Sequence, residues 1–118
     1  MKAELARKSP TEKAFTAQIL AFAKLHGWRS AHFRPAETKR GWRTAVSGDG
    51  KGFPDLVLAR GAGGKGRVLF VELKAERGKA SDAQEVWATV LTSIGGTVEY
   101  YRWRPSDWKE IERVLSNL

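Results

Sequence analysis

Apolar residues recur along this chain with two different periods, and the period changes where one element gives way to the next. Phe15, Ile19 and Phe22 are spaced by three or four residues, which predicts a helix with one apolar side. Gly27 is the predicted end of this helix. Beyond it, short apolar segments bounded by turn residues predict strands at residues 28–34, 55–60, 67–74 and 97–103.

The first helix has a start signal in the sequence Ser-Pro-Thr-Glu at residues 9–12. We predict Ser9 as the N-cap and Pro10 as the first helical residue, so that Glu12 takes the third position of a capping box. Glu12 also precedes Phe15 by three residues, which places it on the inward side of the helix. Two interpretations of Glu12 therefore stay open, a helix cap and an acid that faces a functional site.

Two more helices are predicted in the second half of the chain. Ser81 is the expected N-cap of one, which stops at Gly95, and Ser106 is the expected N-cap of the other. Apolar residues at helical spacing predict which side of each helix is buried, and Phe15, Trp87 and Trp108 are expected in the core. These stripes consist of Ala83, Val86, Trp87, Val90, Leu91 and Ile94 in the helix after Ser81 and of Trp108, Ile111, Val114 and Leu115 in the helix after Ser106.

The predicted elements follow the order αβββαβα and indicate a three-layer α/β/α fold with a central mixed sheet. Strands 55–60 and 67–74 flank a Gly-rich turn at residues 61–66, so an antiparallel hairpin is expected. Strands 67–74 and 97–103 are separated by a helix, and such a crossover favours parallel pairing.

Composition adds constraints on the domain count, the partner and the compartment. A length of 118 residues suits one domain spanning residues 1–118. Lysine and arginine number 21 against 13 aspartate and glutamate, and the net charge of +8 favours a polyanionic partner such as nucleic acid. The absence of cysteine excludes disulfides and thiol nucleophiles. Since neither a membrane helix nor a signal peptide is recognisable, we expect a soluble cytoplasmic protein.

The sequence Val-Leu-Phe-Val-Glu-Leu-Lys at residues 68–74 carries the clearest chemical signal. Strand side chains alternate, so Glu72 and Lys74 share one face of a segment that is otherwise apolar on both faces, and buried charges need partners. Asp55 begins the neighbouring strand, and antiparallel pairing brings it to the same sheet edge as Glu72. The simpler interpretations are a solvated ion pair and a turn aspartate after Pro54.

Two carboxylates at one sheet edge repel each other unless a cation lies between them. A hard divalent ion is the natural cation, because magnesium binds one or two carboxylates and keeps room for waters and a substrate phosphate. The ammonium group of Lys74 would orient a water molecule for attack on phosphorus. This pattern predicts metal-dependent hydrolysis of a phosphate ester.

The same residues resemble the motifs of the PD-(D/E)xK nuclease superfamily, and most closely those of its VRR-NUC family, in the small stand-alone type of phages and bacteria. The features of that family are a G-x-P-D turn, an apolar strand ending in E-L-K, and a following helix with S-x-x-Q-x-x-W. Here they read Gly52-Phe53-Pro54-Asp55, Glu72-Leu73-Lys74, and Ser81, Gln84 and Trp87. The resemblance extends from about Glu12 to Trp103.

The resemblance implies a restriction-endonuclease-like fold and a DNA endonuclease that depends on Mg²⁺, with Mn²⁺ as a substitute. It implies a homodimer that cuts branched or four-way-junction DNA in the cytoplasm of a bacterium or a phage-infected host cell. The implied metal ligands are Glu12, Asp55, Glu72 and the carbonyl group of Leu73, and Lys74 is the implied water-positioning residue.

Gln84 and Trp42 each keep two interpretations. Gln84 faces the active site in the resembled family, which makes it a catalytic candidate, but Ser81-x-x-Gln84 is equally a capping box. Trp42 lies among cations, where it could stack on an unpaired base or fold back onto the core. Residues 35–51 depart from the family pattern, because they form a long basic segment without a motif. The candidate nucleic-acid contacts are Arg34, Lys39, Arg40, Trp42, Arg43, Lys51, Arg77 and Lys79.

Two alternatives to a junction endonuclease stay open. One is a nucleic-acid-binding module that keeps the nuclease fold and has lost catalysis, although the full acid set argues against it. The other is an exonuclease or nickase on ordinary duplex DNA, which the same active site would serve. Binding without Mg²⁺-dependent cleavage would identify the module, and the products from linear, nicked and four-way DNA would separate the nucleases.

Overall fold

The computed structural model describes residues 10–33, 36–38, 41–43 and 48–117, of which 36–38 and 41–43 are described as backbone only. Its elements are α2 (Glu12–Leu25), β1 (Arg29–His32), β2 (Ala36–Thr38), β3 (Gly41–Arg43), β4 (Leu56–Arg60), β5 (Arg67–Leu73), α3 (Asp82–Ile94), β6 (Val98–Trp103), a 3-10 turn η1 (Pro105–Asp107) and α4 (Trp108–Ser116). The predicted order αβββαβα is confirmed, and the small hairpin β2–β3 is inserted between β1 and β4.

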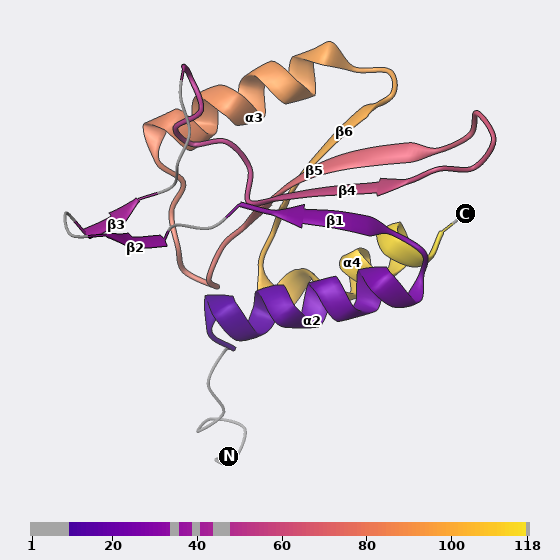
Figure 1. Ribbon diagram of the computed structural model, residues 1–118, viewed down its shortest axis with the longest axis horizontal. Coiled ribbons are helices and arrows are strands. Elements are labelled where there is room, and N and C mark those ends of the chain that lie inside the picture. The colour runs from indigo at the N-terminus through magenta and orange to yellow at the C-terminus, as the bar shows by residue number, and fades with distance from the viewer. Residues whose placement is uncertain (1–9, 34–35, 39–40, 44–47, 118) are drawn as a thin grey trace.

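The central sheet has four strands in the order β1-β4-β5-β6. β4 pairs antiparallel with β1 and with β5, whereas β5 and β6 are parallel, so the predicted mixed sheet is confirmed. Figure 1 shows α2 and α4 on one face of this sheet and α3 on the other. This three-layer α/β/α arrangement is consistent with the core of the restriction-endonuclease-like fold.

The main core lies between the sheet and the helices α2 and α4. Leu58 of β4 and Leu69 of β5 are register partners on this face, and both are fully buried. Phe15 and Ile19 of α2 pack into the same cluster. The predicted buried side of the first helix is therefore confirmed for its apolar residues, which recur at the spacing of one helix face. Glu12, which was expected on the same inward side, is exposed.

Two predicted helix caps are wrong. α2 begins at Glu12 with Thr11 as its N-cap, whose hydroxyl oxygen accepts a hydrogen bond from the Ala14 backbone N–H at 3.0 Å. Glu12 is thus the first residue of the helix and takes no part in a capping box; Ser9 lies outside the described residues. Ser106 lies within η1, and Asp107 is the N-cap of α4. Each region holds two residues of cap type close together, and the Asp107 carboxylate accepts a hydrogen bond from the Arg104 backbone N–H at the start of η1 instead of capping α4.

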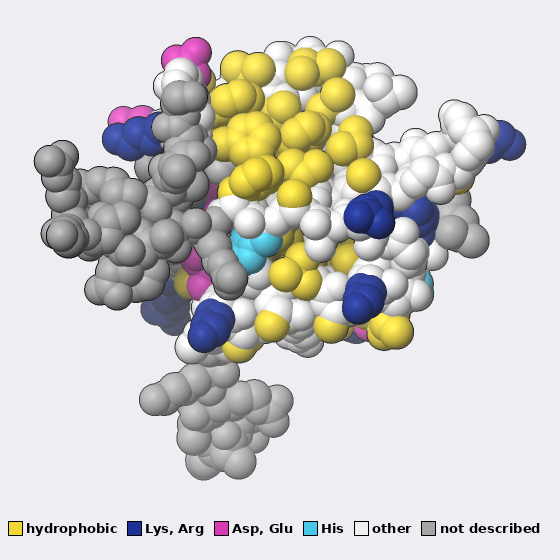
Figure 2. Space-filling view, in the orientation of Figure 1, with side chains coloured by type: hydrophobic (Ala, Val, Ile, Leu, Met, Phe, Trp, Pro, Cys, Tyr) yellow, Lys and Arg dark blue, Asp and Glu magenta, His cyan; other side chains and the backbone are white. Residues whose placement is uncertain are grey.

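The apolar stripe of α3 is only partly buried, which corrects the prediction for this helix. Leu91 is 6% exposed, whereas Val86, Val90 and Ile94 are 62%, 47% and 58% exposed. Figure 2 shows hydrophobic side chains gathered on this face of the molecule. Among the strands, α3 packs chiefly on β6, so water reaches the side of the helix that points away from that strand. No helix in the described part of the chain has the length and hydropathy that a bilayer crossing requires.

Candidate active site

Asp55 is carried by a turn that docks on the first turn of α3. Gly52 in this turn has a φ of +83°, and a Cβ at this position would lie 2.5 Å from the backbone carbonyl carbon of Ala83. Only glycine satisfies both conditions, because it tolerates positive φ and lets two backbone segments approach closely. Pro54 follows, fully buried, and leads into β4. The docking of this turn on α3 therefore fixes the position of Asp55, which follows Pro54.

The register of the hairpin brings Asp55 opposite Glu72. Leu56 pairs with Val71, and one step further along both strands Asp55 faces Glu72. Asp55 Oδ2 accepts a hydrogen bond of 2.7 Å from the backbone N–H of Leu73, and the Asp55 carbonyl oxygen accepts one of 2.8 Å from the backbone N–H of Phe33. These bonds hold Asp55 between β1 and β5 at one end of the sheet.

The charge on Asp55 is disfavoured by its surroundings. Burial is the main cause that raises the pKa of Asp55 from 3.8 to about 6, and the hydrogen bond from Leu73 opposes it. The negative charges of Glu12 and Glu72 raise this pKa further, while Lys74 lowers it. A carboxyl group in such a site gains from any cation that reaches it.

Glu72 is 1% exposed, although it carries a carboxylate. The Tyr100 hydroxyl donates a hydrogen bond of 2.9 Å to Glu72 Oε1. Lys74 Nζ lies 3.7 Å from Glu72 Oε2, and Arg102 Nε lies 3.5 Å from the same oxygen. Despite these two cations, Oε2 accepts no hydrogen bond from the described residues.

Lys74 lies one pleat beyond Glu72 and is held by the chain that follows it. Its Nζ donates a hydrogen bond of 3.0 Å to the carbonyl oxygen of Lys79. The backbone N–H of Lys74 donates to the Trp103 carbonyl oxygen at 2.9 Å, which continues the pairing of β5 with β6. Arg104 fixes the same loop, because its Nη1 donates to the carbonyl oxygens of Ala75 and Gly78. The ammonium group thus has a defined place beside the Glu72 carboxylate.

Comparison with protein-family models decides the family. The model of the VRR-NUC domain matches residues 4–104 of the chain. The chain belongs to the VRR-NUC family. VRR-NUC domains are PD-(D/E)xK nucleases, and a nuclease-family function follows. A comparison with curated proteins and a comparison with solved structures each found no match.

The candidate acids differ in how closely they gather. The structure brings Asp55, Glu72 and Lys74 together, whereas Glu12 is exposed and is linked to them by its electrostatic effect on Asp55. Within the described ranges, no three histidine, cysteine or acidic side chains stand close enough together to hold a metal ion. Any ion held here would rely on two carboxylates and water, with Glu12 as a more distant acid.

The donor set of this candidate site fits a hard divalent ion. Both close acids offer oxygen, which magnesium and manganese prefer. Glu72 Oε2 is buried and accepts no hydrogen bond from any described residue, so it keeps its lone pairs for another partner. The raised pKa of Asp55 indicates a second oxygen that a cation would stabilise.

Two residues of β6 belong to this site although the sequence did not single them out. Tyr100 and Arg102 face Glu72 from the parallel neighbour strand, where Arg102 is the register partner of Glu72. Burial, followed by the hydrogen bond to Glu72, raises the pKa of Tyr100 to about 12, so the hydroxyl stays protonated and donates at neutral pH. The available signal was that Tyr100 and Arg102 are two residues apart and therefore share one face of β6.

Gln84 forms the capping box that its spacing predicts. Its Oε1 accepts a hydrogen bond of 2.8 Å from the Ser81 backbone N–H, and the Ser81 hydroxyl oxygen accepts one of 3.2 Å from the Gln84 backbone N–H. The capping interpretation is therefore confirmed. A catalytic role for Gln84 stays a prediction, and it would have to use the amide nitrogen.

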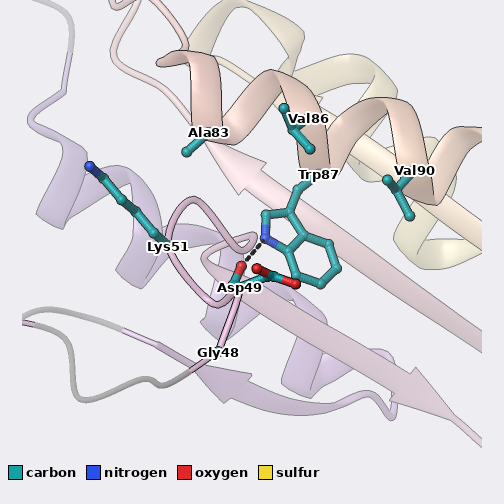
Figure 3. A pocket seen from close by; sticks show the side chains of 7 residues that line it. All are labelled: Gly48, Asp49, Lys51, Ala83, Val86, Trp87 and Val90. Atoms are coloured by element: carbon teal, nitrogen blue, oxygen red, sulfur yellow. Dashed lines mark hydrogen bonds between the residues drawn. The ribbon is translucent and has the colours of Figure 1, made fainter.

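Trp87 is half-buried and supports the loop before Gly52, so its predicted place in the core is wrong. Its indole N–H donates a hydrogen bond of 2.9 Å to the Asp49 carbonyl oxygen, and its ring meets Phe53 edge to face at 4.9 Å. Figure 3 shows Trp87 pointing from α3 toward this loop. Trp87 and Lys51 both line a cavity of about 510 Å³ between α3 and this loop. Trp108 is partly buried against the core, and Phe15 is confirmed as a core residue.

The candidate DNA contacts are only partly described. Arg34, Lys39 and Arg40 lie outside the described residues, and Trp42 and Arg43 lie in β3 without described side chains. Lys51, Arg77 and Lys79 are exposed on the loops next to Asp55 and Lys74.

Proposed function

We propose that this VRR-NUC domain is a Mg²⁺-dependent DNA endonuclease, with Mn²⁺ as a substitute, acting in the cytoplasm of a bacterium or a phage-infected host cell. The observation that carries the proposal is the buried Glu72 Oε2, which accepts no hydrogen bond from the described residues and has Asp55 and Lys74 beside it. A buried oxygen of this kind costs free energy unless it serves a ligand.

Asp55 and Glu72 would hold the metal ion, with the Leu73 carbonyl oxygen as a further ligand and Glu12 as the outer acid. When bound, the ion would supply positive charge for the phosphate and make water more acidic. Lys74 would orient the attacking water and stabilise the charge that develops on the phosphate oxygens. The water oxygen attacks phosphorus and the bond from phosphorus to the leaving oxygen breaks.

Branched or four-way-junction DNA is the proposed substrate. The C-terminal end of β1, the start of β4 and the end of β5 meet at one end of the sheet, which is where Asp55 and Glu72 lie. The β2–β3 hairpin projects beyond this end (Figure 1). Basic residues in the segment 34–51 and on the loop after Lys74 would contact phosphates on both sides of the cut.

A homodimer is the proposed active form. Each chain carries one candidate site, and paired cuts in a symmetric junction need two sites related by a twofold axis. Light scattering of the active protein at several concentrations tests this part, and a monomer that resolves junctions with paired cuts would contradict it.

The decisive experiment uses labelled four-way junctions and matched duplexes, with Mg²⁺ or with a chelator. We expect Asp55→Ala, Glu72→Ala and Lys74→Ala each to lower the rate of cleavage at least about 100-fold, because each removes a charge that acts in the transition state. DNA binding should be largely kept. Lys65→Ala is the matched control for Lys74→Ala, since Lys65 is an exposed lysine in the distant β4–β5 turn.

The outcomes separate this proposal from its alternatives. Cleavage that survives all three active-site variants would show that the site is wrong. Binding without Mg²⁺-dependent cleavage would identify an inactive module, and cleavage of linear or nicked duplex as efficient as that of junctions would identify an exonuclease or a nickase.

A further inference from the structure

The two oxygens of Glu72 have different surroundings. Oε1 accepts the hydrogen bond from the Tyr100 hydroxyl, which fixes the rotation of the carboxylate. Oε2 is buried with two cations near it, and neither donates a hydrogen bond to it. A buried carboxylate normally draws such cations into short, charge-assisted hydrogen bonds. The absence of hydrogen bonds from Lys74 and Arg102 to Oε2 therefore requires a structural explanation.

The cause lies in the orientation of Arg102. Its Nη2, which shares one edge of the guanidinium group with Nε, donates a hydrogen bond of 2.8 Å to Oε1 of Glu85 on α3. Its Nε remains 3.5 Å from Glu72 Oε2 and, like that oxygen, has no hydrogen-bond partner among the described residues. Glu85 thus takes the donor that would otherwise reach the buried carboxylate.

We propose that Arg102 is a positioning residue for Glu72, and that Glu85 holds its guanidinium in an orientation that compensates the charge of Glu72 while leaving Oε2 free to bind a metal ion. The inference rests on the proposed function. It assigns Glu85, on the exposed start of α3, a part in setting the metal affinity. The lone pairs of Oε2 stay available because Arg102 compensates the negative charge of Glu72 without donating a hydrogen bond to Oε2.

Two variants are expected to change the metal affinity in opposite directions. Glu85→Ala releases Arg102, which can then form a bidentate pair with Glu72 and occupy Oε2. Arg102→Gln removes a positive charge that a bound cation must face. We expect the apparent Mg²⁺ dissociation constant to rise roughly three- to tenfold for Glu85→Ala and to fall by a similar factor for Arg102→Gln.

The measurement is a Mg²⁺ titration of the full chain without DNA, read from the dependence of the Tm on Mg²⁺ concentration and from calorimetry. In a chelator, Arg102→Gln should also lower the Tm, because Lys74 is then the one described cation near Glu72 Oε2. Asp82→Ala removes a carboxylate from the same end of α3 and controls for general electrostatics, with an expected change below about twofold.

The double variant Glu85→Ala/Arg102→Gln decides whether Glu85 acts through Arg102. It should behave like Arg102→Gln alone, since Glu85 then has no guanidinium to hold. Additive effects would overturn the inference, as would a shift in the same direction for both single variants. Should Arg102→Gln not fold, Arg102→Lys replaces it in the cycle. Lysine keeps the charge but lacks the guanidinium fork, so Glu85→Ala should change the Mg²⁺ dissociation constant less in this background than in the wild type. If wild-type protein shows neither Mg²⁺ binding nor cleavage, the proposed function fails together with this inference. If wild-type protein binds Mg²⁺ and cleaves DNA, but the effects of the two substitutions on the dissociation constant add, this inference alone fails.

Discussion

Asp55 carries the most strongly perturbed carboxyl group with a resolved pKa in the described site. Its pKa of about 6 in the folded protein exceeds the ordinary 3.8, chiefly because of burial. Between these two values, the folded chain binds the Asp55 proton more tightly than the unfolded chain does. This group therefore links the stability of the protein to the pH of the medium.

The sign of the linkage gives a prediction for the metal-free protein. From about pH 4 to about pH 6 the free energy of unfolding should fall as the pH rises, since the folded state holds the extra proton. Asp55→Asn should remove this part of the slope. Melting in a chelator across this range measures both, and an unchanged slope in Asp55→Asn would contradict the assignment. Added Mg²⁺ should stabilise wild-type protein more at pH 7 than at pH 5, because the ion binds the ionised carboxylate.

Part of the site was predictable residue by residue. Asp55, Glu72 and Lys74 stand out because a charged strand end inside an apolar segment, next to a hairpin partner, is a local pattern. Tyr100 and Arg102 were missed, because their contact with Glu72 depends on the register of β6, which reaches β5 only after the whole of α3. The register of two strands joined by a crossover depends on how whole elements pack, so a short sequence segment does not predict it.

Among the elements, the turn that carries Asp55 and the helix α3 approach each other closely at Gly52. The positive φ of Gly52 and the closeness of Ala83 mean that this helix positions the turn as well as covering the sheet. Trp87 supports the same loop from one helical turn further along α3. The close approach at Gly52 and the contacts of Trp87 therefore connect α3 to the turn that carries Asp55.

Gly52→Ala should disturb both the stability and the site. Positive φ alone costs about 1 kcal/mol for alanine, and the overlap with Ala83 should add roughly 1–3 kcal/mol. Gly63→Ala is the matched control, since Gly63 also has positive φ but nothing within 4 Å of the added Cβ. Denaturant unfolding and cleavage assays check the pair. Equal losses in the two variants would contradict the proposed role of the close approach.

The sequence predicted the types of the helices and strands better than the residues at which they begin and end. All the helices and strands of the main sheet were predicted, because each has a clear apolar period or a turn on either side. Thr11 rather than Ser9 caps α2, and Asp107 rather than Ser106 caps α4. Cap-type residues one or two positions apart are nearly equivalent locally, so sequence alone places a helix start only to within one or two residues.

For the molecule as a whole, the net charge of +8 is the property most relevant to DNA. Phosphate contacts release counterions, so affinity should fall linearly with salt on a double-logarithmic plot. Exposed Arg77 and Lys79 lie on the loop after Lys74, and the bond from Lys74 to Lys79 uses the backbone oxygen, so it does not depend on the Lys79 side chain.

Arg77→Gln/Lys79→Gln should therefore reduce the salt slope by about 1 to 2 units while leaving the fold intact. Binding of labelled DNA in a chelator at several salt concentrations measures the slope. Lys109→Gln on α4, on the face of the sheet opposite α3, controls for loss of net charge. A control variant that lowers the slope as much as the pair would refute a specific contact at this loop.

Sequence alone determined the order of the elements, the antiparallel hairpin and the candidate acids at its end, because periodicity and short turns are local properties of the chain. Tertiary structure alone decided that Tyr100 and Arg102 stand beside Glu72, that Glu85 holds Arg102, and that Val86, Val90 and Ile94 remain exposed on α3. These features depend on which faces meet across long stretches of sequence. The packing of whole elements sets that choice, and the periodicity of a single element is compatible with several arrangements.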